Sequence, residues 1–269
     1  MVIDGKLLSL KHQEKLKQEL DALKKKSLRT PVVISFCNRE DAPSVKYTDM
    51  KQKKAEEIGV KFIPLIYSSK TNISDLKQMI EENNQKSDVD GIMVQLPLSD
   101  RLNPFKEDLL DLIKPEKDID GLTNEGRKIY LPATIKGTIS ILDSIKISFW
   151  EETFAVVGSE GEIGKPMVEV LKSYGARVLE IDKEIGDINT DLKSATVIIS
   201  CTGQRDLIKP EMISGGVVLI DVGLGDFEEG CYEKARAYTP VTGGVGPMTV
   251  ISLMENVVKS YELGNTEEK

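Results

Sequence analysis

Stretches of residues typical of buried strands alternate with helical patterns along the chain. Strand-like stretches rich in β-branched residues occupy 30–37, 61–68 and 91–98, and helical patterns at 44–59 and 73–84 separate them. Strands that are apolar on both faces belong in parallel sheets, and helical connections then lie over the faces of the sheet. The alternation therefore predicts an α/β fold built on parallel sheets.

This pattern breaks once, near the middle of the chain. Residues 115–137 are rich in Gly, Pro, Asp and Asn and show little periodicity, so we interpret them as a hinge between two lobes. A length of 269 residues accommodates two modest domains. A second series follows, with strands expected at 153–158, 176–182, 195–200 and 217–222 and helices at 138–146, 165–174 and 249–263. A first helix is expected at 7–26, and residues 264–269 are expected to fray.

Charge and composition argue against several classes of function. The chain has 44 acidic and 36 basic residues and a net charge of −8, whereas a nucleic-acid-binding protein usually carries a basic face. The longest apolar stretches fall short of the ~18 residues that a membrane helix needs. Cys37, Cys201 and Cys231 are widely spaced and give neither a disulfide framework nor a zinc pattern. We therefore expect a cytoplasmic protein without a nucleic-acid or membrane partner.

His12 is the single histidine and lies in a leucine-striped helical segment. This setting favours a solvated or half-buried helix residue over a catalytic one. One histidine leaves almost no material for a Ser-His-Asp triad or a multi-histidine metal site, and we expect no bound metal. Acid–base chemistry must then come from Lys, Tyr, Asp or Glu.

Three glycines indicate a nucleotide site in the second lobe. Gly158, Gly161 and Gly164 follow an expected strand and precede an expected helix, where glycines let the backbone approach a pyrophosphate. Their G-x-x-G-x-x-G spacing differs from the common G-x-G-x-x-G, and glycines also close ordinary strand–helix turns, so a structural role stays open. Asp182 ends the next expected strand and is placed to bind a ribose hydroxyl, although an Asp that starts a turn is common.

The charges around this loop bear on the choice of cofactor. Glu160 inside the loop and Asp182 would both repel a 2′-phosphate, which favours NAD over NADP. Lys183 has the opposite effect.

Tyr47 and Lys51 are four residues apart on an expected helix and so share a face, with Ser44 on the same side. A lysine beside an aromatic hydroxyl in a partly desolvated cleft can have a lowered pKa and serve as an acid–base group. The spacing alone favours a merely solvated helix face, because Lys53 and Lys54 follow directly.

Six segments, taken in order, resemble the methylenetetrahydrofolate dehydrogenase/methenyltetrahydrofolate cyclohydrolase (FolD) family. They are PSVKYTDMKQKKAEEIGV, DGIMVQLPL, PEKDIDGLTNEG, VVGSEGEIGKPM, IDVG and TPVTGGVGPMTV. The resemblance covers nearly the whole chain. It implies a three-layer βα catalytic lobe over residues 1–120, joined by a C-terminal helix at 249–269. It also implies a Rossmann-like NAD(P)-binding lobe over 121–248, an active site in the cleft between the lobes, and a homodimer.

The resemblance also assigns roles to individual residues. It implies that Lys51, Tyr47 and Gln95 are catalytic. The folate substrate would contact Tyr47, Asp120, Gly243, Gly244 and Pro247. The cofactor would contact Gly158, Ser159, Glu160, Gly164, Asp182, Thr202, Leu224 and Thr249.

The departures from the family pattern lie mainly at the adenosine end of the cofactor. The family's G-[RA]-S-x-x-V-G is GSEGEIG here, and Asp182-Lys183 stand where relatives have His-Ser. The family default is NADP, so the choice between NADP and NAD stays open. The family's P-C-T-P-x-G is PATIKG at 132–137, and Thr242 replaces a proline before the glycine pair.

The implied activity is bifunctional. The enzyme would oxidise 5,10-methylenetetrahydrofolate with NAD(P) and hydrolyse the methenyl product to 10-formyltetrahydrofolate. Two alternatives stay open: a cyclohydrolase alone, whose altered glycine loop no longer binds cofactor usefully, and a non-catalytic dinucleotide-binding protein, because fold does not imply function.

Overall fold

The computed structural model describes residues 1–27, 29–186 and 188–266. The chain divides into two compact units. The three-stranded unit comprises residues 11–133 and those from 250 onward, and the five-stranded unit comprises residues 1–10 and 134–249. Helices α1 (Gly5–Ser27) and α9 (Val245–Thr266) each contribute residues to both units.

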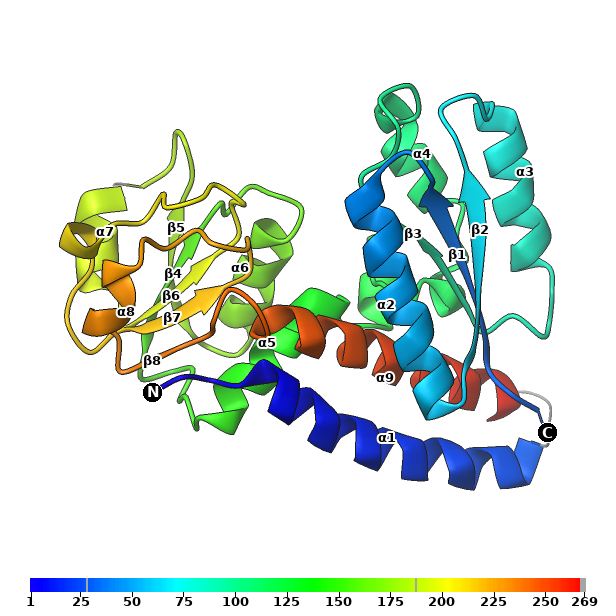
Figure 1. Ribbon diagram of the computed structural model, residues 1–269, viewed down its shortest axis with the longest axis horizontal. Helices are drawn as coiled ribbons and strands as arrows, with labels where there is room; N and C mark the ends of the chain where they lie inside the picture. The colour runs from blue at the N-terminus through cyan, green and yellow to red at the C-terminus, as the bar shows by residue number, and fades with distance from the viewer. Residues whose placement is uncertain (28, 187, 267–269) are drawn as a thin grey trace. The chain divides into compact units, whose positions relative to one another are not determined.

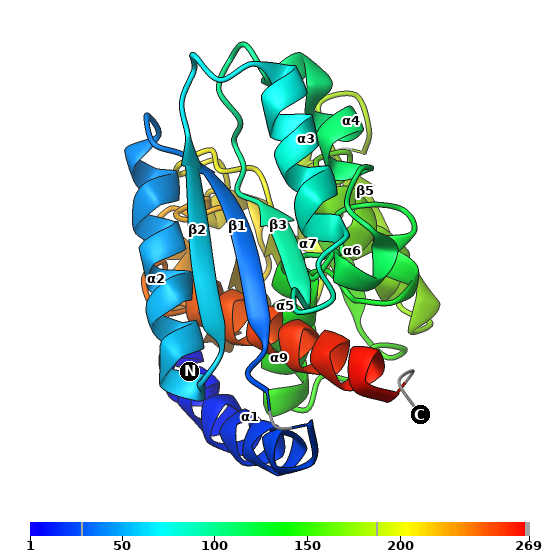
Figure 2. The same ribbon diagram turned by 90° about the vertical axis from the view of Figure 1, so that its right-hand side faces the viewer.

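The three-stranded unit is a βα sandwich around one parallel sheet. Strands β1 (Val32–Asn38), β2 (Lys61–Tyr67) and β3 (Gly91–Val94) pair in the order β2-β1-β3. Helices α2 (Ala42–Ile58) and α3 (Ile73–Asn84) connect the strands and lie on either side of the sheet (Figure 2). The short helix α4 (Lys106–Leu110) follows β3.

Alternation along β1 directs its side chains to the two helices. Ile34 and Phe36 join Leu76 and Ile80 of α3 in one buried cluster. Because successive strand residues point to opposite faces, Cys37 and its alternate neighbours face α2 instead. The sheet is thus apolar on both sides, as the strand-like stretches predict.

Helix α2 has well-defined ends. Asp41 accepts a hydrogen bond from the Ser44 N–H at 2.9 Å, which caps the first turn. Gly59 ends the helix in the left-handed conformation, with φ +94°, as glycine does at many helix ends. Both ends of α2 are therefore marked by local sequence signals.

The five-stranded unit is also a parallel sheet covered by helices (Figure 1). Its strand order is β5-β4-β6-β7-β8, so the direction of connection reverses at β4. The strands are β4 (Thr153–Val157), β5 (Arg177–Ile181), β6 (Val197–Ser200), β7 (Val218–Asp221) and β8 (Ala237–Tyr238). The helices are α5 (Ala133–Ser144), α6 (Gly164–Ser173), α7 (Ile188–Ser194) and α8 (Gly230–Lys234). The predicted α/β class with parallel sheets is confirmed.

The observed division differs from the expected ranges at two places. Residues 1–10 lie with the five-stranded unit because Ile3 N–H donates to Tyr238 O at 2.8 Å and Tyr238 N–H donates to Met1 O at 3.0 Å. Residues 121–133 lie with the three-stranded unit, where Asn256 Nδ2 donates to Leu131 O at 2.9 Å. The boundary at 133/134 falls inside the segment interpreted as a hinge.

Several element ends also differ from expectation. Strand β3 stops at Val94, before Pro97, which has no N–H for a sheet ladder. Helix α9 begins at Val245 rather than 249, because Pro247 is tolerated in a first helical turn. Helix α5 begins at Ala133 rather than 138. Of the expected frayed tail, residues 264–266 continue α9, and residues 267–269 lie outside the described part of the chain.

Among the residues that the structure describes, no helix has both the length and the apolarity needed to cross a membrane. His12 Nδ1 lies 2.9 Å from Glu255 Oε1 and joins α1 to α9, so its contact is with a neighbouring helix.

Candidate functional site

Lys51 is a buried lysine in the middle of α2, with 4% of its surface exposed. Its Nζ donates a hydrogen bond to Gln95 Oε1 at 2.9 Å and lies 4.8 Å from the centre of the Tyr47 ring. Gln95 directly follows β3, and its Nε2 donates to Leu96 O at 2.8 Å, which orients Oε1 toward the lysine. The structure therefore brings together the three residues expected to be catalytic.

The surroundings of Lys51 change its proton affinity. Burial lowers the pKa of Lys51, and the charges of Asp120 and Cys37 oppose this shift only in part. A lysine with a lowered pKa exchanges protons closer to neutral pH than an exposed one. The Tyr47 ring face adds a cation–π contact. This environment is unlike that of Lys54, which pairs with Glu57 at the surface.

Two residues of the KDIDG segment build the loop that carries Asp120. Lys117 Nζ donates to Asn84 O at 2.9 Å and so holds the end of α3. Asp118 is buried, and its Oδ2 accepts hydrogen bonds from the Thr123 N–H at 2.9 Å and Oγ1 at 2.8 Å. Burial raises the pKa of Asp118, and these hydrogen bonds counteract the rise. Asp120 is half-buried, and its charge acts on Lys51.

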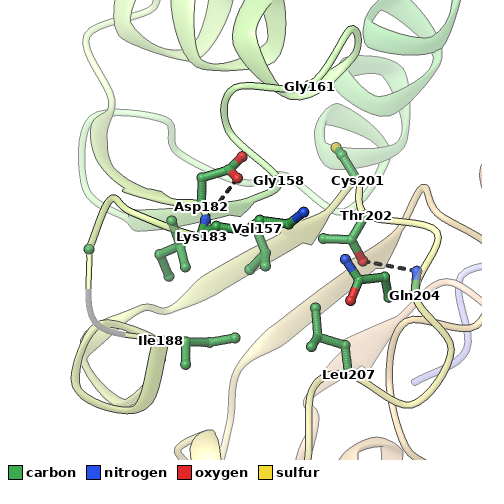
Figure 3. A pocket seen from close by; sticks show the side chains of 12 residues that line it. Val157, Gly158, Gly161, Asp182, Lys183, Ile188, Cys201, Thr202, Gln204 and Leu207 are labelled. Carbon is green, nitrogen blue, oxygen red and sulfur yellow. Dashed lines mark hydrogen bonds between the residues drawn. The ribbon is translucent and has the colours of Figure 1, made fainter.

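A cavity of about 580 Å³ lies in the five-stranded unit, at the carboxyl ends of β4, β5 and β6. Gly158, Gly161, Asp182 and Thr202 contribute to its lining (Figure 3). The connections reverse direction at β4, and parallel sheets usually bind ligands at such a point. The volume lies within the roughly 300–1,000 Å³ of small-molecule and cofactor sites.

The glycine loop at this cavity requires glycine at specific positions. Gly158 has φ +81°, in the left-handed region. A Cβ on Gly164 would lie 1.8 Å from Gly158 O, so only glycine permits this close return of the chain. Ser159 is buried beneath the loop, whereas Glu160 is exposed. The loop thus has the tight backbone cradle that a diphosphate needs.

Asp182 directly follows β5 and lines the cavity. Its Oδ2 accepts the Glu160 N–H at 2.9 Å, and its Oδ1 accepts the Lys183 N–H at 2.8 Å, the latter drawn in Figure 3. These hydrogen bonds lower the pKa of Asp182. The carboxylate is therefore negatively charged, fixed in orientation and tied to the glycine loop.

The remaining expected cofactor contacts are not gathered at one place. Thr202 lines the cavity, but Leu224 and Thr249 are not among its lining residues. Leu224 is 68% exposed at φ +71°, and the Thr249 hydroxyl donates to Val245 O within α9.

The expected folate loop from Gly243 to Pro247 is held by the first turn of α1. Lys6 N–H donates to Gly243 O at 3.0 Å. A Cβ on Gly5 would lie 1.8 Å from Gly244 O. The loop and the helix therefore approach as closely as backbone atoms allow.

Asp226 is a residue that the sequence analysis missed. Its Oδ2 accepts hydrogen bonds from the Thr202 N–H at 2.9 Å and Oγ1 at 2.8 Å, although the two residues are far apart in sequence. No local pattern indicates such a pairing. In the described part of the chain, no group of three or more His, Cys, Asp or Glu side chains is placed to hold a metal.

Known proteins resemble both units. Residues 3–120 match the catalytic domain of tetrahydrofolate dehydrogenase/cyclohydrolase, and residues 132–265 match its NAD(P)-binding domain. The chain is 34% identical over 277 residues to the bifunctional protein FolD of Bacillus licheniformis, with 96% of each chain covered.

Solved structures resemble the whole chain. The crystal structure of the bifunctional enzyme FolD, methylenetetrahydrofolate dehydrogenase/cyclohydrolase, from Campylobacter jejuni matches with a TM-score of 0.89 at 30% identity, covering 98% of this chain and 99% of that one. The Trypanosoma brucei dehydrogenase-cyclohydrolase, complexed with NADP cofactor and inhibitor, matches with a TM-score of 0.89 at 25% identity, covering 98% and 97%.

Proposed function

The chain belongs to the tetrahydrofolate dehydrogenase/cyclohydrolase family, and on that premise we propose that its acid–base chemistry is centred on Lys51 while the five-stranded unit binds the cofactor. As a bifunctional enzyme it oxidises 5,10-methylenetetrahydrofolate with NAD(P) and hydrolyses the methenyl product to 10-formyltetrahydrofolate. The buried Lys51 ammonium, bonded to Gln95 above the Tyr47 ring, carries the proposal. A protein that only binds dinucleotides has no use for a buried, perturbed lysine.

Asp120 and Tyr47 hold the folate substrate. The Asp120 carboxylate accepts hydrogen bonds from the pterin 2-amino group and N3, which are the charge-assisted contacts that fix a planar heterocycle. The Tyr47 ring packs on the folate. Asp118 and Thr123 support this arrangement by holding the loop around Asp120.

Lys51 handles the protons of the hydrolase step. Water attacks the methenyl carbon, and neutral Lys51 takes a proton from that water. The bond from this carbon to N5 then breaks, Lys51 returns its proton to N5, and the remaining hydroxyl proton leaves as the formyl group forms. Gln95 keeps the amine directed at the reacting carbon through its 2.9 Å hydrogen bond.

The cavity residues of the five-stranded unit hold the cofactor. The nicotinamide ring supplies a hydride acceptor when it is bound. Gly158 and Gly164 leave room for a diphosphate at the start of α6. Asp182 presents a fixed carboxylate to the ribose hydroxyls.

We propose that NAD is preferred over NADP. The pKa of Asp182 is lowered by two backbone N–H donors, so its negative charge persists at neutral pH and repels a 2′-phosphate. Lys183 also lines the cavity and offsets part of that repulsion.

One assay tests these proposals together. Reduced nicotinamide and methenyl-folate are followed by absorbance in the same reaction, once with NAD and once with NADP. We expect turnover with both and a larger kcat/KM with NAD. Hydrolysis of methenyl-folate without reduction of either cofactor would leave a cyclohydrolase alone. Binding of NAD without either reaction would leave a non-catalytic dinucleotide-binding protein.

Two further properties are proposed from the family resemblance, namely a homodimer and a cytoplasmic location. Light scattering of the purified protein tests the first, and cell fractionation tests the second. A monomeric mass or a membrane-bound pool would contradict them.

A further inference from the structure

We propose that Asp226 is a positioning residue for the cofactor cavity. Its buried carboxylate holds the segment 200–203, which leaves the end of β6 and carries Thr202 into the cavity wall. The inference rests on the proposed function in one respect, because it takes this cavity as the cofactor site.

One oxygen of Asp226 gathers the donors of this segment. Asp226 Oδ2 accepts hydrogen bonds from Thr202 N–H at 2.9 Å and Thr202 Oγ1 at 2.8 Å. It also accepts from Ser200 Oγ at 2.5 Å and from Gly203 N–H at 3.3 Å. Four donors on one carboxylate oxygen define the course of the backbone more tightly than sequence-local turns do.

The carboxylate is itself rigidly placed. Asp221 Oδ2 accepts the Gly225 N–H at 2.7 Å, which shapes the turn before Asp226. Ile208 N–H donates to Asp226 O at 2.9 Å and fixes the backbone of the residue. A Cβ on Gly223 would lie 2.3 Å from Asp226 Oδ2, so only a glycine at 223 lets the backbone pass this close to the carboxylate.

Thr202 also contacts the glycine loop, so its position affects that loop. Its Cγ2 lies 3.2 Å from the place where a Cβ on Gly158 would be, so the Thr202 methyl group packs against the first glycine of the loop. Both residues line the cavity, as does Gln204, whose N–H donates to Thr202 Oγ1 in Figure 3. Release of Thr202 from Asp226 would therefore move the cavity wall and crowd the glycine loop.

The bifunctional chemistry provides an internal control for the test. Hydrolysis of methenyl-folate consumes no nicotinamide cofactor and is centred on Lys51, so it reports on the rest of the fold. In Asp226→Ala we expect the KM for NAD to rise on the order of tenfold, equivalent to one charge-assisted hydrogen bond. We expect the kcat of hydrolysis to stay within about twofold of the unmodified enzyme. Glu229→Ala, an exposed acid nearby in the sequence, is the matched control and should change neither value.

A conservative variant separates positioning from loss of charge. Asp226→Asn keeps one acceptor oxygen of the same shape, so we expect it to raise the KM for NAD by only a few-fold. If Asp226→Ala does not fold, the same comparison is made with Asp226→Asn.

Two results would overturn the proposal. One is an unchanged KM for NAD in the variant that folds, and the other is an equal loss of dehydrogenase and hydrolase activity, which would mark general structural support. Failure of the proposed function is distinguishable, because the unmodified enzyme would then show no reduction of NAD or NADP at all.

Discussion

The ammonium of Lys51 donates a 2.9 Å hydrogen bond to Oε1 of Gln95, a residue 44 positions later in the chain. Gln95 cannot offer its amide nitrogen instead without giving up its bond to Leu96 O. A buried cation with a neutral acceptor opposes folding, because water solvates an ammonium better. The burial of Lys51 at this place is therefore explained by its role in the reaction rather than by a gain in folding stability.

Replacement of Lys51 should abolish the hydrolase step. We expect Lys51→Met to lower the rate of methenyl-folate hydrolysis at least about 10²-fold, the lower range of a general acid–base contribution. Lys51→Arg should be similarly impaired, because a guanidinium does not release its proton. Loss of the methenyl-folate absorbance measures the rate. A normal rate in Lys51→Met would show that the assigned role is wrong.

The same replacement should stabilise the protein at neutral pH. The folded-state pKa of Lys51 is lowered, so between that pKa and the ordinary lysine value of about 10.4 the unfolded chain binds more protons, and stability rises with pH. Below this window the lysine is charged in both states, and the full penalty of its burial applies. We expect Lys51→Met to gain about 1 kcal/mol in the free energy of unfolding at pH 7. The free energy of unfolding of the variant should also rise less steeply between these pH values, because the variant lacks the lysine that titrates. Urea titrations at several pH values measure both effects, and a less stable variant at pH 7 would contradict the expectation.

Gln95 should affect both the rate and its pH dependence. A hydrogen-bond acceptor favours the ammonium form, so Gln95→Leu removes a contact that raises the Lys51 pKa. We expect the kcat of hydrolysis to fall on the order of tenfold, since the amine loses its orientation. The acid limb of the pH–rate profile, which reports the deprotonation of Lys51, should move to lower pH. Gln78→Leu, at an exposed position on α3, serves as the control. An upward shift of the limb would refute this account.

Replacement of Asp118 should lower the stability of the protein, whereas replacement of Asp120 should raise the KM for the folate substrate. Asp118→Asn puts an amide where the Thr123 N–H and hydroxyl need an acceptor, and we expect a loss of about 2 kcal/mol in stability. Asp120→Asn should stay within about 0.5 kcal/mol of the unmodified protein. It should instead raise the KM for methylene-folate on the order of tenfold, the equivalent of one hydrogen bond to a charged group. Chemical denaturation measures the stability of each variant, and initial rates measure its KM. A large loss of stability in Asp120→Asn together with a raised KM in stable Asp118→Asn would show that the two roles are assigned the wrong way round.

Gly5→Ala should disturb the loop that contains Gly243 and Gly244. The added Cβ would lie 1.8 Å from Gly244 O, so backbone must move, and we expect a loss of about 1–3 kcal/mol. Gly215→Ala is the control, because a Cβ at that position has no atoms within 4 Å. Thermal unfolding compares the two variants. Equal midpoints would show that the α1 contact does not support the loop.

Local signals in the sequence were sufficient for part of the fold and part of the site. Short apolar stretches rich in β-branched residues, separated by helical patterns, predicted the parallel strands, because a strand buried on both faces is apolar along its whole length. The four-residue spacing placed Tyr47 and Lys51 on one helical face, and glycine spacing marked the loop after β4. The start of α9 was less accessible, because Val245 lies in a glycine-rich segment that resembles a loop.

Other features depend on contacts between distant segments, and only the tertiary structure decided them. Spacing alone favoured a solvated helix face for Lys51, and its burial beside Gln95 came from the packing of α2 on the sheet. The same holds for Asp226, whose donors lie more than twenty residues away. Solvation and hydrogen bonding at such positions are set by neighbours brought together in three dimensions, and local sequence patterns carry no record of them.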